Sequence, residues 1–113
     1  MAVTVAPLFN PTLLTGAAAT IYTVPSSPTS LVYGNVRVRF TNVAAVPASV
    51  TAYAIPSGGT ATATNTCLNA VSIAVNGYLD VDVPMLGPGG FFQAFGSITS
   101  DITVSCLNAV QFS

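Results

Sequence analysis

The stretch that decides the fold is VRVRFTNVAAVPASVTAYAI, residues 36–55. At its start, apolar Val36, Val38 and Phe40 alternate with arginine and threonine. This period of two is typical of a strand that buries one face. Asparagine, proline and serine between positions 42 and 49 indicate a turn, and residues 50–55 form a second β-rich run. We therefore expect residues 36–55 to form a β-hairpin.

Similar β-rich runs, separated by turn residues, continue through the chain. Residues 78–83 alternate in the same way, and residues 71–75 precede Asn76-Gly77, a dipeptide favoured in tight hairpin turns. About eight short strands and no helical periodicity predict an all-β fold, a single-domain antiparallel β-sandwich of jelly-roll type. We place this domain at residues 13–113. Residues 1–12, which contain two prolines, are expected to form an extended arm that lies on a neighbouring subunit.

The chain carries very little charge. Only 4% of its 113 residues are charged, two of them arginine and three aspartate, while 51% are hydrophobic. A typical soluble domain is about one quarter charged, and surface charge discourages unwanted association. We therefore expect other protein, first of all further copies of this chain, to cover much of the surface.

A membrane location is not expected, although the mean hydropathy is +0.71. The longest span without charge, residues 40–79, is interrupted by Pro47, Pro56 and Gly58. A helix that crosses a bilayer needs about 20 consecutive apolar residues. The N-terminal segment lacks the lysine or arginine of a secretory signal peptide. We therefore expect synthesis in the cytoplasm without a membrane partner.

The side chains needed for most chemistry are missing. The chain has no histidine, lysine, glutamate or tryptophan, so a serine or cysteine nucleophile lacks its usual base. Asp80 and Asp82 supply too few oxygens for calcium, and two cysteines without histidine do not complete a zinc site within one chain. Two arginines are too few to neutralise a nucleic-acid backbone. We expect no catalysis, cofactor, metal or nucleic acid.

Two sets of residues are candidates for interaction sites. Arginines and aspartates recur at a spacing of two on separate strands, so opposite charges can pair across a ladder within or between subunits. The alternative is that these four charges are simply solvated. The aromatic residues are too large to leave in water and belong to the core or to an interface. The charged candidates are Arg37, Arg39, Asp80 and Asp82, and the aromatic candidates are Tyr53, Phe91, Phe92 and Phe95.

The two cysteines, Cys67 and Cys106, each begin the same five-residue word, CLNAV. The repeat indicates two strands in equivalent settings or a short internal duplication. A disulfide requires a Cα separation below about 7 Å, which the sequence does not show. A disulfide and two small buried thiols both remain open at this point.

Three segments carry a resemblance to a known group of proteins. They are LTGAAATIYTVP at residues 14–25, VRVRFTN at 36–42 and VTAYAIPSGG at 50–59. In this combination they resemble small virion structural proteins of tailed bacteriophages, where a Tyr-Thr-x-Pro strand precedes strands that end in Thr-Asn and in Pro-Ser-Gly-Gly. The resemblance covers residues 13–60. The low charge and the two CLNAV words depart from the pattern of that group.

The resemblance implies a jelly-roll-like sandwich with a structural role in the virion. The function that it favours is a capsid decoration, or cement, protein that forms a homotrimer and bridges subunits of the major capsid protein. The alternative is a tail or fibre component that binds a receptor, with Tyr33, Tyr53 and Tyr78 as platforms for sugars. A further alternative is a secreted or surface structural module unrelated to phage, to which the missing signal segment is the main objection.

Overall fold

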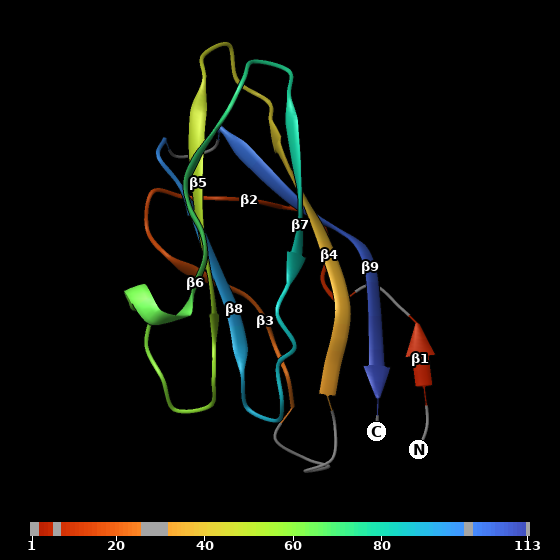
Figure 1. Cartoon of the computed structure of the whole chain (residues 1–113). Helices are drawn as coiled ribbons and strands as arrows, with labels where there is room; N and C mark the ends of the chain where they lie inside the picture. The colour runs from red at the N-terminus through yellow and green to blue at the C-terminus, as the bar shows by residue number, and fades with distance from the viewer. Residues whose placement is uncertain (1–2, 6–7, 26–31, 99–100, 113) are drawn as a thin grey trace.

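Nine strands and one short turn of 3-10 helix make up the protein in its computed structural model, which describes residues 3–5, 8–25, 32–98 and 101–112 (Figure 1). The elements are β1 (Val3–Val5), β2 (Thr12–Leu13), β3 (Ala19–Thr23), β4 (Val32–Asn42), β5 (Ala48–Ile55), η1 (Ala63–Asn65), β6 (Thr66–Ile73), β7 (Tyr78–Val83), β8 (Phe91–Gly96) and β9 (Ile102–Phe112). No helix in the described part of the chain is long and apolar enough to cross a bilayer.

The strands form two antiparallel sheets that pack face to face. One sheet has the order β1-β9-β4-β7, with β2 also paired to β9, and the other has the order β3-β8-β5-β6. Because β1 and β2 both pair with β9, they act as one interrupted strand, and the order is then that of an eight-stranded jelly roll. The predicted all-β antiparallel sandwich is confirmed. Of the residues assigned to the arm, Val3–Val5 and Thr12 pair with β9 of the same chain.

The core lies between the two sheets. Alternation along β4 turns Val36, Val38 and Phe40 inward, each at most 1% exposed. The facing sheet contributes Val50 and Phe92, which are fully buried. Leu14, Val24, Ile102 and Val104 complete the layer. The inward face of β4 therefore follows directly from its apolar alternation.

The expected hairpin over residues 36–55 is wrong. Strand β4 pairs with β7 and β9, whereas β5 belongs to the other sheet and pairs with β6 and β8. The segment between them is a corner that crosses from one sheet to the other. Asn42, only 1% exposed, shapes this corner: its Nδ2 donates to the carbonyls of Val46 (2.9 Å) and Ile73 (3.0 Å), and its Oδ1 accepts the amide of Ala44 (2.9 Å).

The expected hairpin at Asn76-Gly77 is also wrong, for the same reason. The turn itself exists: Asn76 has a φ of +60° and the Gly77 amide donates to the Ala74 carbonyl at 2.8 Å. However, it joins β6 in one sheet to β7 in the other. A favourable turn dipeptide sets the local path of the chain and does not decide which strands pair.

The two CLNAV words lie in different sheets, on β6 and β9, and both strands pair irregularly there. The register shifts between Val50 and Ala52 opposite the first word, and on both sides of Arg37 opposite the second. Both cysteines are free and partly buried. The repeat therefore marks two β-bulges.

Candidate interaction surfaces

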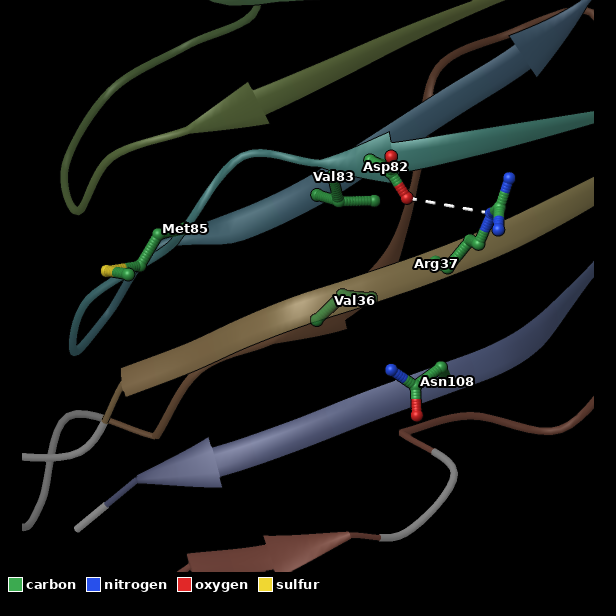
Figure 2. Close-up of a pocket in the computed structure, with 6 residues that line it drawn as sticks. All are labelled: Val36, Arg37, Asp82, Val83, Met85 and Asn108. Atoms are coloured by element: carbon green, nitrogen blue, oxygen red, sulfur yellow. Dashed lines mark ion pairs between the residues drawn. The ribbon is translucent and has the colours of Figure 1, made fainter.

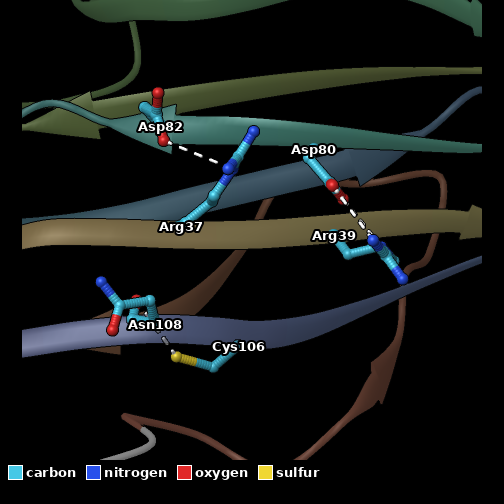
Figure 3. A network of polar contacts seen from close by, with 6 residues as sticks. All are labelled: Arg37, Arg39, Asp80, Asp82, Cys106 and Asn108. Atoms are coloured by element: carbon cyan, nitrogen blue, oxygen red, sulfur yellow. Dashed lines mark hydrogen bonds and ion pairs between the residues drawn. The ribbon is translucent and has the colours of Figure 1, made fainter. Parts of the chain in front are cut away.

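The four charged candidates lie on the outer face of the five-stranded sheet, where β4 and β7 run side by side (Figure 3). Since Val36, Val38 and Phe40 point inward, the arginines between them point outward. The register of β4 and β7 sets Arg37 opposite Asp82 and Arg39 opposite Asp80. The structure thus brings the four residues together as two cross-strand ion pairs.

The pair formed by Arg39 and Asp80 is tight. The Arg39 Nε donates to Oδ1 of Asp80 at 2.7 Å and Nη2 donates to Oδ2 at 3.1 Å, the two-point geometry of a strong charge-assisted hydrogen bond. The guanidinium also lies 4.1 Å from the centre of the Tyr78 ring, a cation–π contact. The hydrogen bond from Arg39 lowers the pKa of Asp80, against an opposing effect of desolvation, and it raises the pKa of Arg39.

The pair formed by Arg37 and Asp82 is loose. Its closest approach is 3.6 Å, longer than a hydrogen bond, and the side chains are 54% and 85% exposed. The two Arg–Asp pairs therefore differ in geometry and exposure. Arg39 and Asp80 are joined by short hydrogen bonds, whereas Arg37 and Asp82 are farther apart and more exposed to solvent.

The aromatic candidates divide between the core and the outer face of the four-stranded sheet. Phe92 is fully buried and stacks on Tyr22, with 5.5 Å between ring centres. Alternation along β8 turns its neighbours Phe91 and Phe95 to the outer face, where both stay partly exposed. Tyr53 of β5 stacks on Phe95 there, with 6.3 Å between ring centres.

Ile55 lies next to this outer aromatic surface, as the cross-strand partner of Phe91. It is fully buried although it does not belong to the core between the sheets, because it lies beside Phe91 and under the loop that follows β5. In that loop, a Cβ atom on Gly59 would come within 3.0 Å of Ile55 Cγ2. We call the partly exposed side chains of Tyr53, Phe91 and Phe95 the aromatic face.

Charge is distributed very unevenly between the two outer faces. The strands β3, β5, β6 and β8 contain no charged residue, whereas β4 and β7 contain four of the five in the chain. The fifth, Asp101, precedes β9. One outer face is therefore charged and the other is aromatic and uncharged.

The structure does not gather the tyrosines into one platform. Tyr53 lies on the aromatic face and Tyr78 on the charged face, and the side chain of Tyr33 is outside the described part of the chain. Sequence reasoning missed Asn42, Met85 and Asn108. Asn42 resembles an ordinary turn residue, and Met85 belongs to no pattern. Asn108 lies in a CLNAV word, and that repeat was the one available signal for it.

The fold and these surfaces define a jelly-roll domain with one uncharged outer face. No protein-family model matches the chain, and no curated protein is similar to it. Among solved structures, a protein of Bacillus endospore appendages, which form disulfide-linked pili, has a TM-score of 0.61 at 14% identity, over 98% of this chain and 88% of that chain. At this identity the likeness shows the shared fold.

Two viral structures are also similar over a part of their length. One is from infectious bursal disease virus, Gx strain, and the other is the VP2 subviral particle of infectious bursal disease virus. Each has a TM-score of 0.49, with identities of 13% and 10%, and the match covers 97% of this chain. It covers only 31% and 32% of those chains.

Proposed function

We propose that this protein is a non-enzymatic structural subunit that assembles with copies of itself through the aromatic face. The observation that carries the proposal is the contrast between the two outer faces. Phe91, Phe95 and Tyr53 stay partly exposed on a sheet surface without charge, where Tyr53 stacks on Phe95. Groups of apolar side chains that remain accessible to solvent are a feature of protein contact sites. The sparse charges are gathered on the opposite face, which an assembly of this kind leaves in solvent.

The surroundings of the two paired carboxylates support a structural role. Asp80 forms a close ion pair with Arg39, and the side chain of Asp82, next to Arg37, is mostly exposed. The hydrogen bond from Arg39 lowers the pKa of Asp80, so this carboxylate is not held in the protonated form that a general acid needs. The described residues also bring together no group of three metal-binding side chains.

The particular assembly that we propose is a virion, in which the protein is a capsid decoration protein. The sequence resemblance over residues 13–60 supports this choice. In this role the protein forms a trimer and bridges subunits of the major capsid protein, and weak contacts are multiplied by symmetry. Binding only to the assembled shell stabilises that shell by mass action.

A tail or fibre component is the second candidate. It rests on the same resemblance over residues 13–60, which is to virion structural proteins of tailed bacteriophages in general. A tail or fibre component would also self-associate through the aromatic face, but it would be present in fewer copies for each particle than a decoration protein.

Copy number in purified particles tests the decoration role. Quantitative mass spectrometry against the major capsid protein is expected to give hundreds of copies for each particle. A handful of copies would assign the protein to the tail. A particle that lacks the protein is expected to break at lower temperature and in low salt, and equal resistance would contradict the decoration role.

A further inference from the structure

Three connections between strands lie together at one end of the sandwich. Hydrogen bonds join them, since the amide of Asn42 donates to the carbonyl of Gly77 at 3.0 Å and the amide of Val43 donates to the carbonyl of Asp101 at 2.9 Å. The connection from β4 to β5 and the connection from β6 to β7 are at the top of Figure 1. The described residues of the three connections are 43–47, 74–77, 97–98 and 101.

Apolar side chains are exposed on these connections. Of the eight large hydrophobic residues that are exposed in the described part of the chain, half lie here: Val43 (56% exposed), Val46 (48%), Val75 (40%) and Ile98 (44%). We call these four side chains the apolar end. On the connections that follow β5 and β7, at the opposite end of the sandwich, one such residue is exposed, Met85. Single apolar residues are ordinary on a surface, whereas a group of them is a feature of contact sites.

The charged face is a poor partner for the apolar end. Residues 43–47, 74–77 and 97–98 contain no charge. On the charged face, Arg37 and Asp82 border an open hollow of about 570 Å³ and are largely exposed (Figure 2). Covering this loose ion pair with valine and isoleucine would remove both charges from water, which costs more than their mutual contact returns. The partner of the apolar end therefore presents an uncharged surface.

The aromatic face of another copy meets this requirement. Its side chains are partly exposed, and the strands that carry them contain no charge. Two aromatic faces could also pack against each other, but that arrangement would leave the apolar ends of both copies in water. Packing the apolar end of one copy on the aromatic face of the next removes both kinds of apolar surface from water, and the hydrophobic effect favours this arrangement.

We propose that the apolar end packs on the aromatic face of a second copy of this chain. The inference rests on the proposed self-association and adds a direction to it, because each copy contributes two different surfaces to its contacts. A head-to-tail contact of this kind builds a closed ring or a filament, whereas a contact between two identical surfaces stops at a pair of copies. A closed ring of three copies would be the trimer proposed for the decoration role.

The test mixes two variants of the full chain, each of which lacks one half of the contact. The double variant Val43→Ser, Val46→Ser alters the apolar end, and Phe95→Ser alters the aromatic face. By light scattering after gel filtration, each variant alone is expected to have the mass of one chain. Mixed in equal amounts, they are expected to form a complex of two chains and no larger, because the intact apolar end of one variant still fits the intact aromatic face of the other.

Two further variants complete the design. Met85→Ser changes an exposed apolar residue at the opposite end of the sandwich, so it is the control and should assemble as the wild type does. Val75→Ser repeats the test on the connection between β6 and β7, so the result does not depend on the folding of the double variant. Circular dichroism spectra that match the wild type show that each variant has folded.

The outcomes separate this inference from the proposed function. Wild-type assembly of the folded apolar-end variants, together with single chains of Phe95→Ser, would overturn the inference and leave the self-association through the aromatic face intact. So would two single-chain variants that do not associate when mixed, which is the result for a contact between identical faces. Wild-type assembly of Phe95→Ser would contradict both proposals. Binding of the wild type to vesicles of neutral phosphatidylcholine, lost in the double variant, would assign the apolar end to a lipid surface and overturn the inference.

Discussion

Arg39 on β4 donates two hydrogen bonds to Asp80 on β7, from Nε to Oδ1 at 2.7 Å and from Nη2 to Oδ2 at 3.1 Å. The contact joins a central strand of the five-stranded sheet to its edge strand. Because it is formed by the ionised carboxylate, it makes the stability of the fold depend on pH.

The pH dependence has a definite sign. The pKa of Asp80 is lower in the folded protein than in the unfolded chain, where it is about 3.9. The stabilisation is therefore complete above the unfolded pKa and is lost as pH falls through the folded pKa. We expect the melting temperature to decrease below about pH 4, and to decrease less in Asp80→Asn. Asp82→Asn is the control and should keep the wild-type profile, whereas matching profiles for Asp80→Asn and the wild type would contradict the role of the pair.

Replacement of Asn42 by alanine is expected to destabilise the fold by about 2 to 4 kcal/mol. The change removes three hydrogen bonds, of which the one to the Ile73 carbonyl is buried and those to the Val46 carbonyl and the Ala44 amide are partly buried. Urea denaturation of the variant measures the loss. Asn69→Ala, an exposed amide on β6, is the control and should change stability by less than about 0.5 kcal/mol. A similar small effect at Asn42 would show that the corner does not depend on its side chain.

Replacement of Phe95 by serine is expected to prevent self-association. Aromatic residues at the centre of an interface commonly contribute about 2 kcal/mol or more, which corresponds to roughly a thirtyfold change in affinity. Light scattering after gel filtration should give a mass near the 11.4 kDa of one chain. Tyr78→Ser, an aromatic change on the charged face, should leave the oligomer intact. An oligomer that survives Phe95→Ser, with an unchanged circular dichroism spectrum, would rule out the aromatic face as the contact.

Exchange of alanine and glycine at two positions of positive φ should have opposite effects. Ala70 has a φ of +48°, so Ala70→Gly removes about 1 to 2 kcal/mol of backbone strain at an entropic cost of roughly 0.5 to 1 kcal/mol. We expect a net stabilisation of about 0.5 to 1 kcal/mol. Gly58 has a φ of +78°, and a Cβ atom at this position would meet nothing within 4 Å, so Gly58→Ala should destabilise by about 1 kcal/mol through the backbone alone. Thermal melts of both variants measure these two effects. A change of melting temperature with the same sign in both variants would contradict the prediction.

The strands could be predicted from the sequence because alternation is a local property. Val36, Val38 and Phe40 indicate their buried face without any knowledge of the partner strand. The partner could not be predicted in the same way: β4 and β5 are neighbours in the chain, yet a corner built by one buried asparagine sends them to different sheets. The same limit applies to Asn76-Gly77.

The site residues show a similar division. Two arginines and two aspartates at equal spacing in a chain with few other charges suggested their own pairing, because so few partners were available. The spacing did not predict that one ion pair is short and the other long and exposed. That difference arises from Tyr78 beside Arg39 and from the bulge at Arg37, and both depend on strands that are distant in sequence.

The position of β9 has a consequence for biosynthesis. This strand pairs with β1, β2 and β4, so the five-stranded sheet cannot form until residues 102–112 have been translated. Until then β1, β2 and the edge of β4 that faces β9 lack their pairing partner, and such long-range pairing is slow. A nascent chain with so little charge is exposed to aggregation during that interval. Efficient production of this protein is therefore expected to depend on the speed at which β9 is translated and on chaperones that shield the unfinished sheet.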